Sequence, residues 1–136
     1  MVTRRPWQAR LLWVDCTAGA LVGVFLLLLS PWLAPLYGLP QGLILFNAAA
    51  NLLYGAYSFS LARRAIRPMR LLVLLVCANA AWSVVCLGLV VRYWHDASVL
   101  GMATLVGESL FVGGLAALEW RHRESLALAP SGTRAQ

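Results

Sequence analysis

Four long runs of apolar residues divide the sequence, separated by short stretches rich in proline or arginine. The runs cover about residues 11–30, 41–61, 71–91 and 98–120. A helix of about 20 apolar residues, rising about 1.5 Å per residue, is long enough to cross the hydrocarbon core of a bilayer. The pattern therefore predicts an all-α integral membrane protein, an antiparallel four-helix bundle.

The connections between the runs carry helix-breaking signals. Residues 31–40 contain three prolines and a glycine, so we expect the first helix to end near Ser30. Pro68 follows a group of arginines and separates the second run from the third. We expect a single domain over residues 1–124, followed by a flexible cytoplasmic tail over residues 125–136, which are mostly small or polar.

Composition supports the membrane interpretation. The chain has 136 residues, of which 61% are hydrophobic and 12% charged. A soluble domain is about half apolar and about a quarter charged. Net charge is +6, and all of the basic residues are arginines. They lie at the ends of the apolar runs and form no basic face, so we expect no nucleic-acid binding.

The arginines also predict an orientation. Ten lie before the first run, between the second and third runs, or after the fourth. The third connection holds Arg92 alone, and the first holds no arginine. Because basic residues gather in cytoplasmic connections, we expect both termini and the 62–70 turn in the cytoplasm, with the chain in a bacterial-type inner membrane.

Polar side chains interrupt the apolar runs near the middle of the expected membrane. Counted along the helices, Asn51, Asn79 and Glu108 fall within about one turn of the midplane. At about 100° per residue, Asn47 and Tyr54 share a helical face with Asn51. Such side chains should face other helices and not lipid. The expected polar seam, a candidate ligand or proton site, consists of Asn47, Asn51, Tyr54, Asn79, Trp82 and Glu108.

Glu108 is the most informative of these residues, because a carboxylate at mid-bilayer must be paired, protonated or hydrated. No arginine is expected at its depth. A neutral Glu108 hydrogen-bonded to Asn51 or Asn79 would hold helices together. The alternative is a proton- or cation-binding site.

Three more polar residues, Asp15, Tyr57 and Glu119, are expected near the inner membrane boundary. Asp15 lies close enough to the surface to pair with an arginine. The candidates for this pairing are Arg10, Arg63 and Arg64.

Catalytic and metal-binding patterns are absent from the sequence. His95 and His122 are predicted on opposite membrane faces, so they cannot jointly bind a haem or metal. Cys16, Cys77 and Cys86 form no Cys-x-x-Cys motif and are expected to pack as small apolar residues. We therefore expect no enzymatic activity, no metal and no cofactor.

The length and four-span layout resemble the small multidrug resistance transporters, which place an essential glutamate within the membrane. That glutamate belongs to the first span of the family, whereas the deep Glu108 here belongs to the fourth, so no functional residue is carried over. The whole chain also resembles small four-span bacterial inner-membrane proteins without an assigned activity.

Two functions agree with this pattern. The first is an interaction or accessory protein whose polar seam fixes its fold or assembly. The alternative is a proton-coupled carrier of a small solute or cation that uses Glu108. The expected partners are the lipid bilayer and either a second copy of the chain or another membrane protein.

The predicted orientation can be tested with reporter fusions. A reporter active only outside the cytoplasm should be active after Leu36 and Asp96 and silent after Ile66, because the arginines hold the 62–70 turn inside. A cytoplasmic reporter at the same positions should give the opposite pattern. External activity after Ile66 would contradict the orientation.

Overall fold

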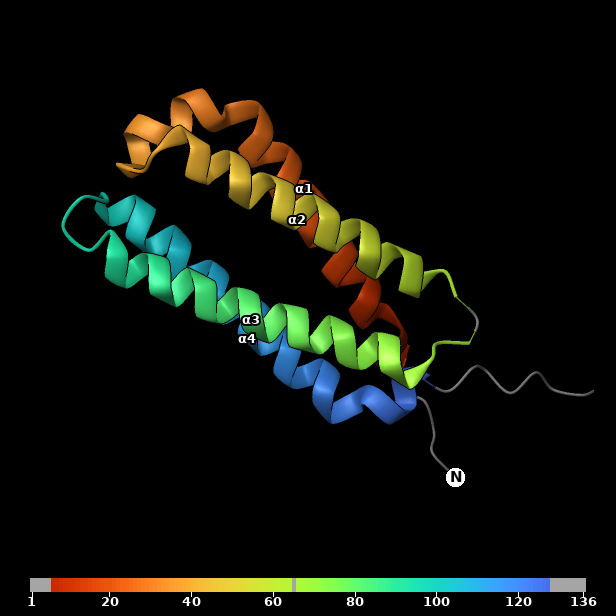
Figure 1. Ribbon diagram of the computed structural model, residues 1–136. Coiled ribbons are helices and arrows are strands. Elements are labelled where there is room, and N and C mark those ends of the chain that lie inside the picture. The colour runs from red at the N-terminus through yellow and green to blue at the C-terminus, as the bar shows by residue number, and fades with distance from the viewer. Residues whose placement is uncertain (1–5, 65, 128–136) are drawn as a thin grey trace, which may run out of the picture.

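The computed structural model describes residues 6–64 and 66–127, which fold into four α-helices (Figure 1). This confirms the predicted all-α class. Helices α1, α3 and α4 are long and apolar enough to cross a membrane. The helices are α1 (Pro6–Tyr37), α2 (Gln41–Ala62), α3 (Met69–Arg92) and α4 (Val99–Ala127).

Helix α1 continues past Ser30 to Tyr37, so the expected end near Ser30 is wrong. Pro31 has no N–H to donate to the carbonyl of Leu27, four residues earlier. The hydroxyl of Ser30 donates to that carbonyl instead, at 3.3 Å. The helix therefore passes through Pro31, and it bends towards its C-terminal end in Figure 1. The chain turns at Gly38, which has a φ of +64°.

Helix α4 also runs beyond its expected boundary. Residues 125–127, predicted as the start of a tail, continue the helix, and Leu126 is buried. Arg67, which follows α2, donates to the Leu126 carbonyl at 3.2 Å and to the Leu61 carbonyl at 2.9 Å. These bonds occupy carbonyls at the ends of two helices. Residues 128–136 of the predicted tail lie outside the described residues.

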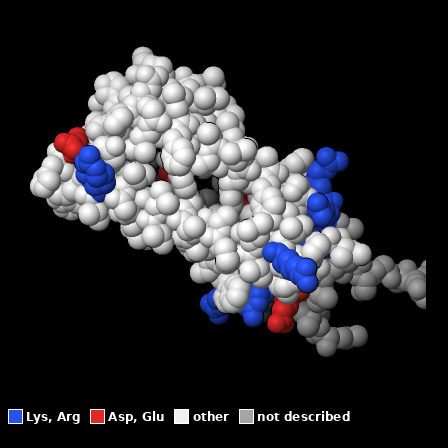
Figure 2. All heavy atoms as spheres, in the orientation of Figure 1, with Lys and Arg blue, Asp and Glu red and all other residues white. Residues whose placement is uncertain are grey.

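The four helices form two hairpins, α1 with α2 and α3 with α4 (Figure 1). Gly19 and Gly55 bring α1 and α2 close together, since a Cβ atom on Gly19 would lie 3.3 Å from the Cα of Gly55. In the second hairpin, the hydroxyls of Ser83 and Ser109 lie 2.9 Å apart. In Figure 2 the charged side chains gather at the two ends of the molecule, and most of the surface between them is uncharged.

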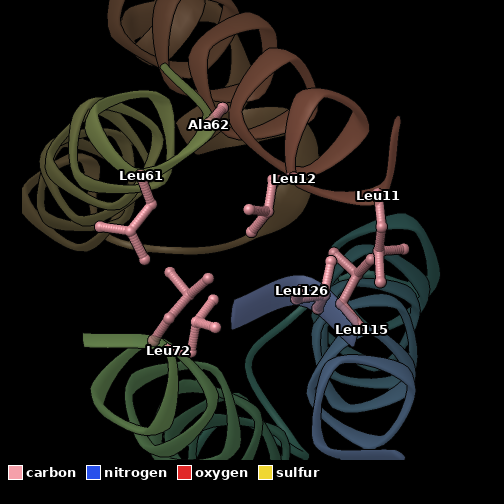
Figure 3. Close-up of a cluster of buried hydrophobic side chains, with 8 residues drawn as sticks. Leu11, Leu12, Leu61, Ala62, Leu72, Leu115 and Leu126 are labelled. Atoms are coloured by element: carbon pink, nitrogen blue, oxygen red, sulfur yellow. The ribbon is translucent and has the colours of Figure 1, made fainter. Parts of the chain in front are cut away.

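The hairpins meet at both ends. Near the α2–α3 connection, leucines from all four helices form a core cluster (Figure 3). At the opposite end, the backbone N–H of Ser98 donates to the Tyr37 carbonyl at 2.8 Å. Polar side chains connect the hairpins between these two contacts. The leucines of the first cluster are Leu11, Leu12, Leu61, Leu72, Leu75, Leu115 and Leu126.

The close approach at Gly101 generates a stability prediction. A Cβ atom at Gly101 would lie 2.3 Å from the Tyr37 carbonyl oxygen, so Gly101→Ala should destabilise the fold by about 1–3 kcal/mol through overpacking. Gly114 on the same helix has open space around its Cβ position, so Gly114→Ala should retain or raise stability. Unfolding in detergent micelles measures both variants. Equal stability of the two variants would contradict the contact.

Candidate functional site

Glu108 of α4 accepts hydrogen bonds from both α2 and α3. Its Oε2 atom accepts from Asn47 Nδ2 at 2.8 Å. Its Oε1 atom accepts from Asn51 Nδ2 at 3.0 Å and from the indole Nε1 of Trp82 at 2.9 Å. Because an indole nitrogen can only donate, Glu108 Oε1 must act as an acceptor. Both carboxyl oxygens therefore face N–H donors.

Asn47 and Asn51 share a face of α2, as their spacing predicts. Asn51 Nδ2 also lies 2.6 Å from Asn47 Oδ1. The expected contact of Glu108 with Asn51 is present in the structure. The alternative partner considered for Glu108 was Asn79. Asn79 does not bond to Glu108 and belongs to a second polar cluster.

The second cluster contains side chains from all four helices. Asp15 Oδ2 of α1 accepts from the Tyr54 hydroxyl at 2.5 Å and from the Ser58 hydroxyl at 2.8 Å. Asn79 Nδ2 of α3 donates to the Tyr54 hydroxyl and, at 3.0 Å, to Glu119 Oε2 of α4. The cluster thus joins the two hairpins by hydrogen bonds.

This arrangement differs from several expectations. Asp15 bonds to Tyr54 and Ser58, where the sequence suggested an arginine. Tyr54 was assigned to the group around Glu108 but donates to Asp15. Tyr57 lies apart from both clusters and donates to the Leu71 carbonyl at 2.9 Å. Ser58 was not among the candidate site residues, although it lies four residues after Tyr54 on the same helical face.

Two cavities are each lined by side chains of both clusters. The larger one, about 350 Å³, lies between α1, α2 and α4 and is lined by Asp15, Asn51, Tyr54 and Glu108. The smaller one, about 160 Å³, is lined by side chains from both hairpins, including those of Asn51, Tyr54 and Asn79. Figure 2 shows an opening between the hairpins with acidic atoms at its edge. The larger cavity also has apolar walls, which include Val22, Phe25, Leu26, Phe111, Val112 and Leu115.

Metal binding is not indicated in the described part of the chain. Within residues 6–64 and 66–127, no three His, Cys, Asp or Glu side chains come together as possible metal ligands. The two clusters contain amide, hydroxyl, indole and carboxyl groups, which suit hydrogen bonding and proton binding.

The chain matches no family model, and no curated protein or solved structure shows significant similarity to it. The functional interpretation therefore depends on the two clusters and the cavities beside them.

The donors around Glu108 generate a second prediction. Glu108→Gln places an amide NH₂ group among three N–H donors, so one donor loses its acceptor and stability should fall by about 1–3 kcal/mol. Glu124→Gln is the matched control, because Glu124 is exposed on the same helix and its change should cost less than about 0.5 kcal/mol. Unfolding in detergent compares the two variants. If Glu108→Gln is as stable as the unaltered protein, a neutral side chain is sufficient as the partner of the three donors.

Proposed function

We propose that the chain is an integral membrane protein in which α2 is a fourth span beside α1, α3 and α4. α2 has 22 residues and packs along α1. Its polar residues Asn47 and Ser58 are buried, whereas Phe46, Leu53 and Phe59 are exposed on its outer surface. A helix with this distribution presents apolar side chains to lipid and polar side chains to the neighbouring helices.

The arrangement of charge supports an orientation with both termini and the α2–α3 connection in the cytoplasm of a bacterial-type inner membrane. Arg67 joins the ends of α2 and α4, which places Arg63, Arg64 and Arg121 at the same end of the molecule. Arg92 lies at the other end of α3. Basic side chains are concentrated at one end in Figure 2, in agreement with the distribution favoured by cytoplasmic connections.

We further propose that the larger cavity binds a small amphipathic cation, the carrier-type function considered from the sequence. Among the described residues that line the cavity, Asp15 and Glu108 are acidic and none is basic. Phe25 and Phe111 contribute aromatic surface to the same space. A cation with an apolar group would bury that group against the walls and place its charge near a carboxylate. The cavity is the observation that favours this function over an accessory role.

Ligand binding can be tested with benzyltrimethylammonium and its uncharged carbon analogue, neopentylbenzene. Isothermal titration calorimetry of the detergent-solubilised protein should detect the cation and give at least about tenfold weaker binding of the neutral analogue, since about 1.4 kcal/mol of charge interaction is a factor of ten. Equal binding of the two compounds would contradict the proposal that the carboxylates attract the positive charge of the ligand.

Two glycine variants on α4 provide a matched comparison for the cavity. Gly107 lines the cavity and has open space at its Cβ position, so Gly107→Leu should fill the cavity and abolish binding without disrupting the fold. Gly114 has the same open space but does not line the cavity, so Gly114→Leu should bind normally. Binding of neither probe by the unaltered protein would favour the accessory role.

A further inference from the structure

Asp15 and Glu119 form a pair of carboxyl groups, of which Asp15 also lines the cavity of the cation-binding proposal. They belong to different hairpins, and their side chains are 2% and 1% exposed. Both carboxyl groups belong to one hydrogen-bonded cluster, in which the Tyr54 hydroxyl donates to Asp15 and accepts from Asn79, and Asn79 also donates to Glu119. A direct hydrogen bond between the two carboxyl groups needs a hydrogen on one of them, because ionised carboxylates can only accept.

The surrounding donors leave one oxygen of the pair unpartnered. Asp15 Oδ2 accepts from Tyr54 and Ser58, and Glu119 Oε2 accepts from Asn79. Glu119 Oε1 is buried and has no hydrogen-bond partner among the donors of the described residues. A buried oxygen without a donor is costly, so this atom indicates a hydrogen between the two carboxyl groups, carried by one of them.

Among the described residues, the hydrogen-bond partners of the pair are hydroxyl and amide groups, which carry no positive charge. Facing the pair, α2 contributes the hydroxyls of Tyr54 and Ser58, and α3 contributes the amide of Asn79. Tyr54 is the one titratable group among these three. Two ionised carboxylates confined within hydrogen-bonding reach would repel each other strongly.

We propose that Asp15 and Glu119 bind one proton jointly and that this proton joins the two hairpins beside the larger cavity. One carboxyl carries the O–H bond, and the other accepts the hydrogen bond through its ionised oxygen. Release of the proton to water leaves two carboxylates, so the direct contact between α1 and α4 is lost at this point. The site is distinct from Glu108, whose oxygens already face N–H donors.

Infrared spectroscopy of the detergent-solubilised full chain tests this assignment. The sequence has five Asp and Glu residues, so the protonated-carboxyl region of the spectrum should be simple. The unaltered protein at neutral pH should show a C=O band of a protonated carboxyl that shifts in D₂O. Absence of this band would overturn the proposal.

Variants assign the band to a residue. Glu119→Gln and Asp15→Asn should each abolish it, because the remaining carboxyl accepts from the new amide and stays ionised. Glu108→Gln and the exposed Glu124→Gln should retain it. A band that is lost in Glu108→Gln and kept in Glu119→Gln would place the proton on Glu108 and overturn the proposal. Should one of the two pair variants fail to fold, the other assigns the band by itself.

A pH series of unfolding midpoints tests the consequence for the hairpins. Above the pKa of the separated carboxyls, and until the pair releases its proton, the folded state holds one proton more than the separated carboxyls, so the midpoint should fall as the pH rises over this range. The fall should be absent in Glu119→Gln, whose amide keeps the contact without a proton, and present in Glu124→Gln. The same pH dependence in all three proteins would overturn the link between the proton and the hairpin contact. Neither measurement requires a ligand, so failure of cation binding and failure of the proton site can be distinguished.

Discussion

A small number of polar groups must find hydrogen-bond partners inside a protein made almost entirely of apolar helices, and this requirement governs how the hairpins meet. A buried donor or acceptor without a partner costs about 1–3 kcal/mol. Within each hairpin, glycines and serines allow close packing. Between the hairpins, Asn79 donates to Tyr54, and Glu108 accepts from Asn47 and Asn51. The relative position of the hairpins is therefore fixed by polar bonds in the middle and by packing at the two ends.

The three acidic residues of this interface lie in two different environments. Glu108 is surrounded by N–H donors, which stabilise an accepting carboxylate. Asp15 and Glu119 share a cluster with Tyr54, Ser58 and Asn79, whose donors leave Glu119 Oε1 without a partner. Asn51 and Tyr54, one turn apart on α2, contact one environment each. A cation site and a proton site can thus lie beside the same cavity because their hydrogen-bond partners differ.

Local patterns in the sequence were sufficient for most of the fold. The apolar runs predict four helices because hydrophobic length and helical period are properties of neighbouring residues. The same period places Asn47 and Asn51 on one face of α2, and the depth estimate brings Asn51 to Glu108. Proline was a less reliable signal, because Pro31 and Pro35 both lie inside α1. The Leu27 carbonyl, to which Pro31 cannot donate, accepts from the Ser30 hydroxyl instead.

The sequence by itself determined the helices, their apolar faces and the concentration of polar groups near mid-length, since these depend on residues within a few turns. Only the tertiary structure decided which polar groups meet. The sequence suggested Glu108 as a partner of Asn79, but Asn79 bonds to Glu119. Glu119 lies eleven residues, or about 16 Å, further along α4 than Glu108. Likewise, Asp15 pairs with Tyr54 and Ser58 of α2. The axial offset and rotation of the two helices within each hairpin select these partners, and both arise from contacts between residues far apart in the chain.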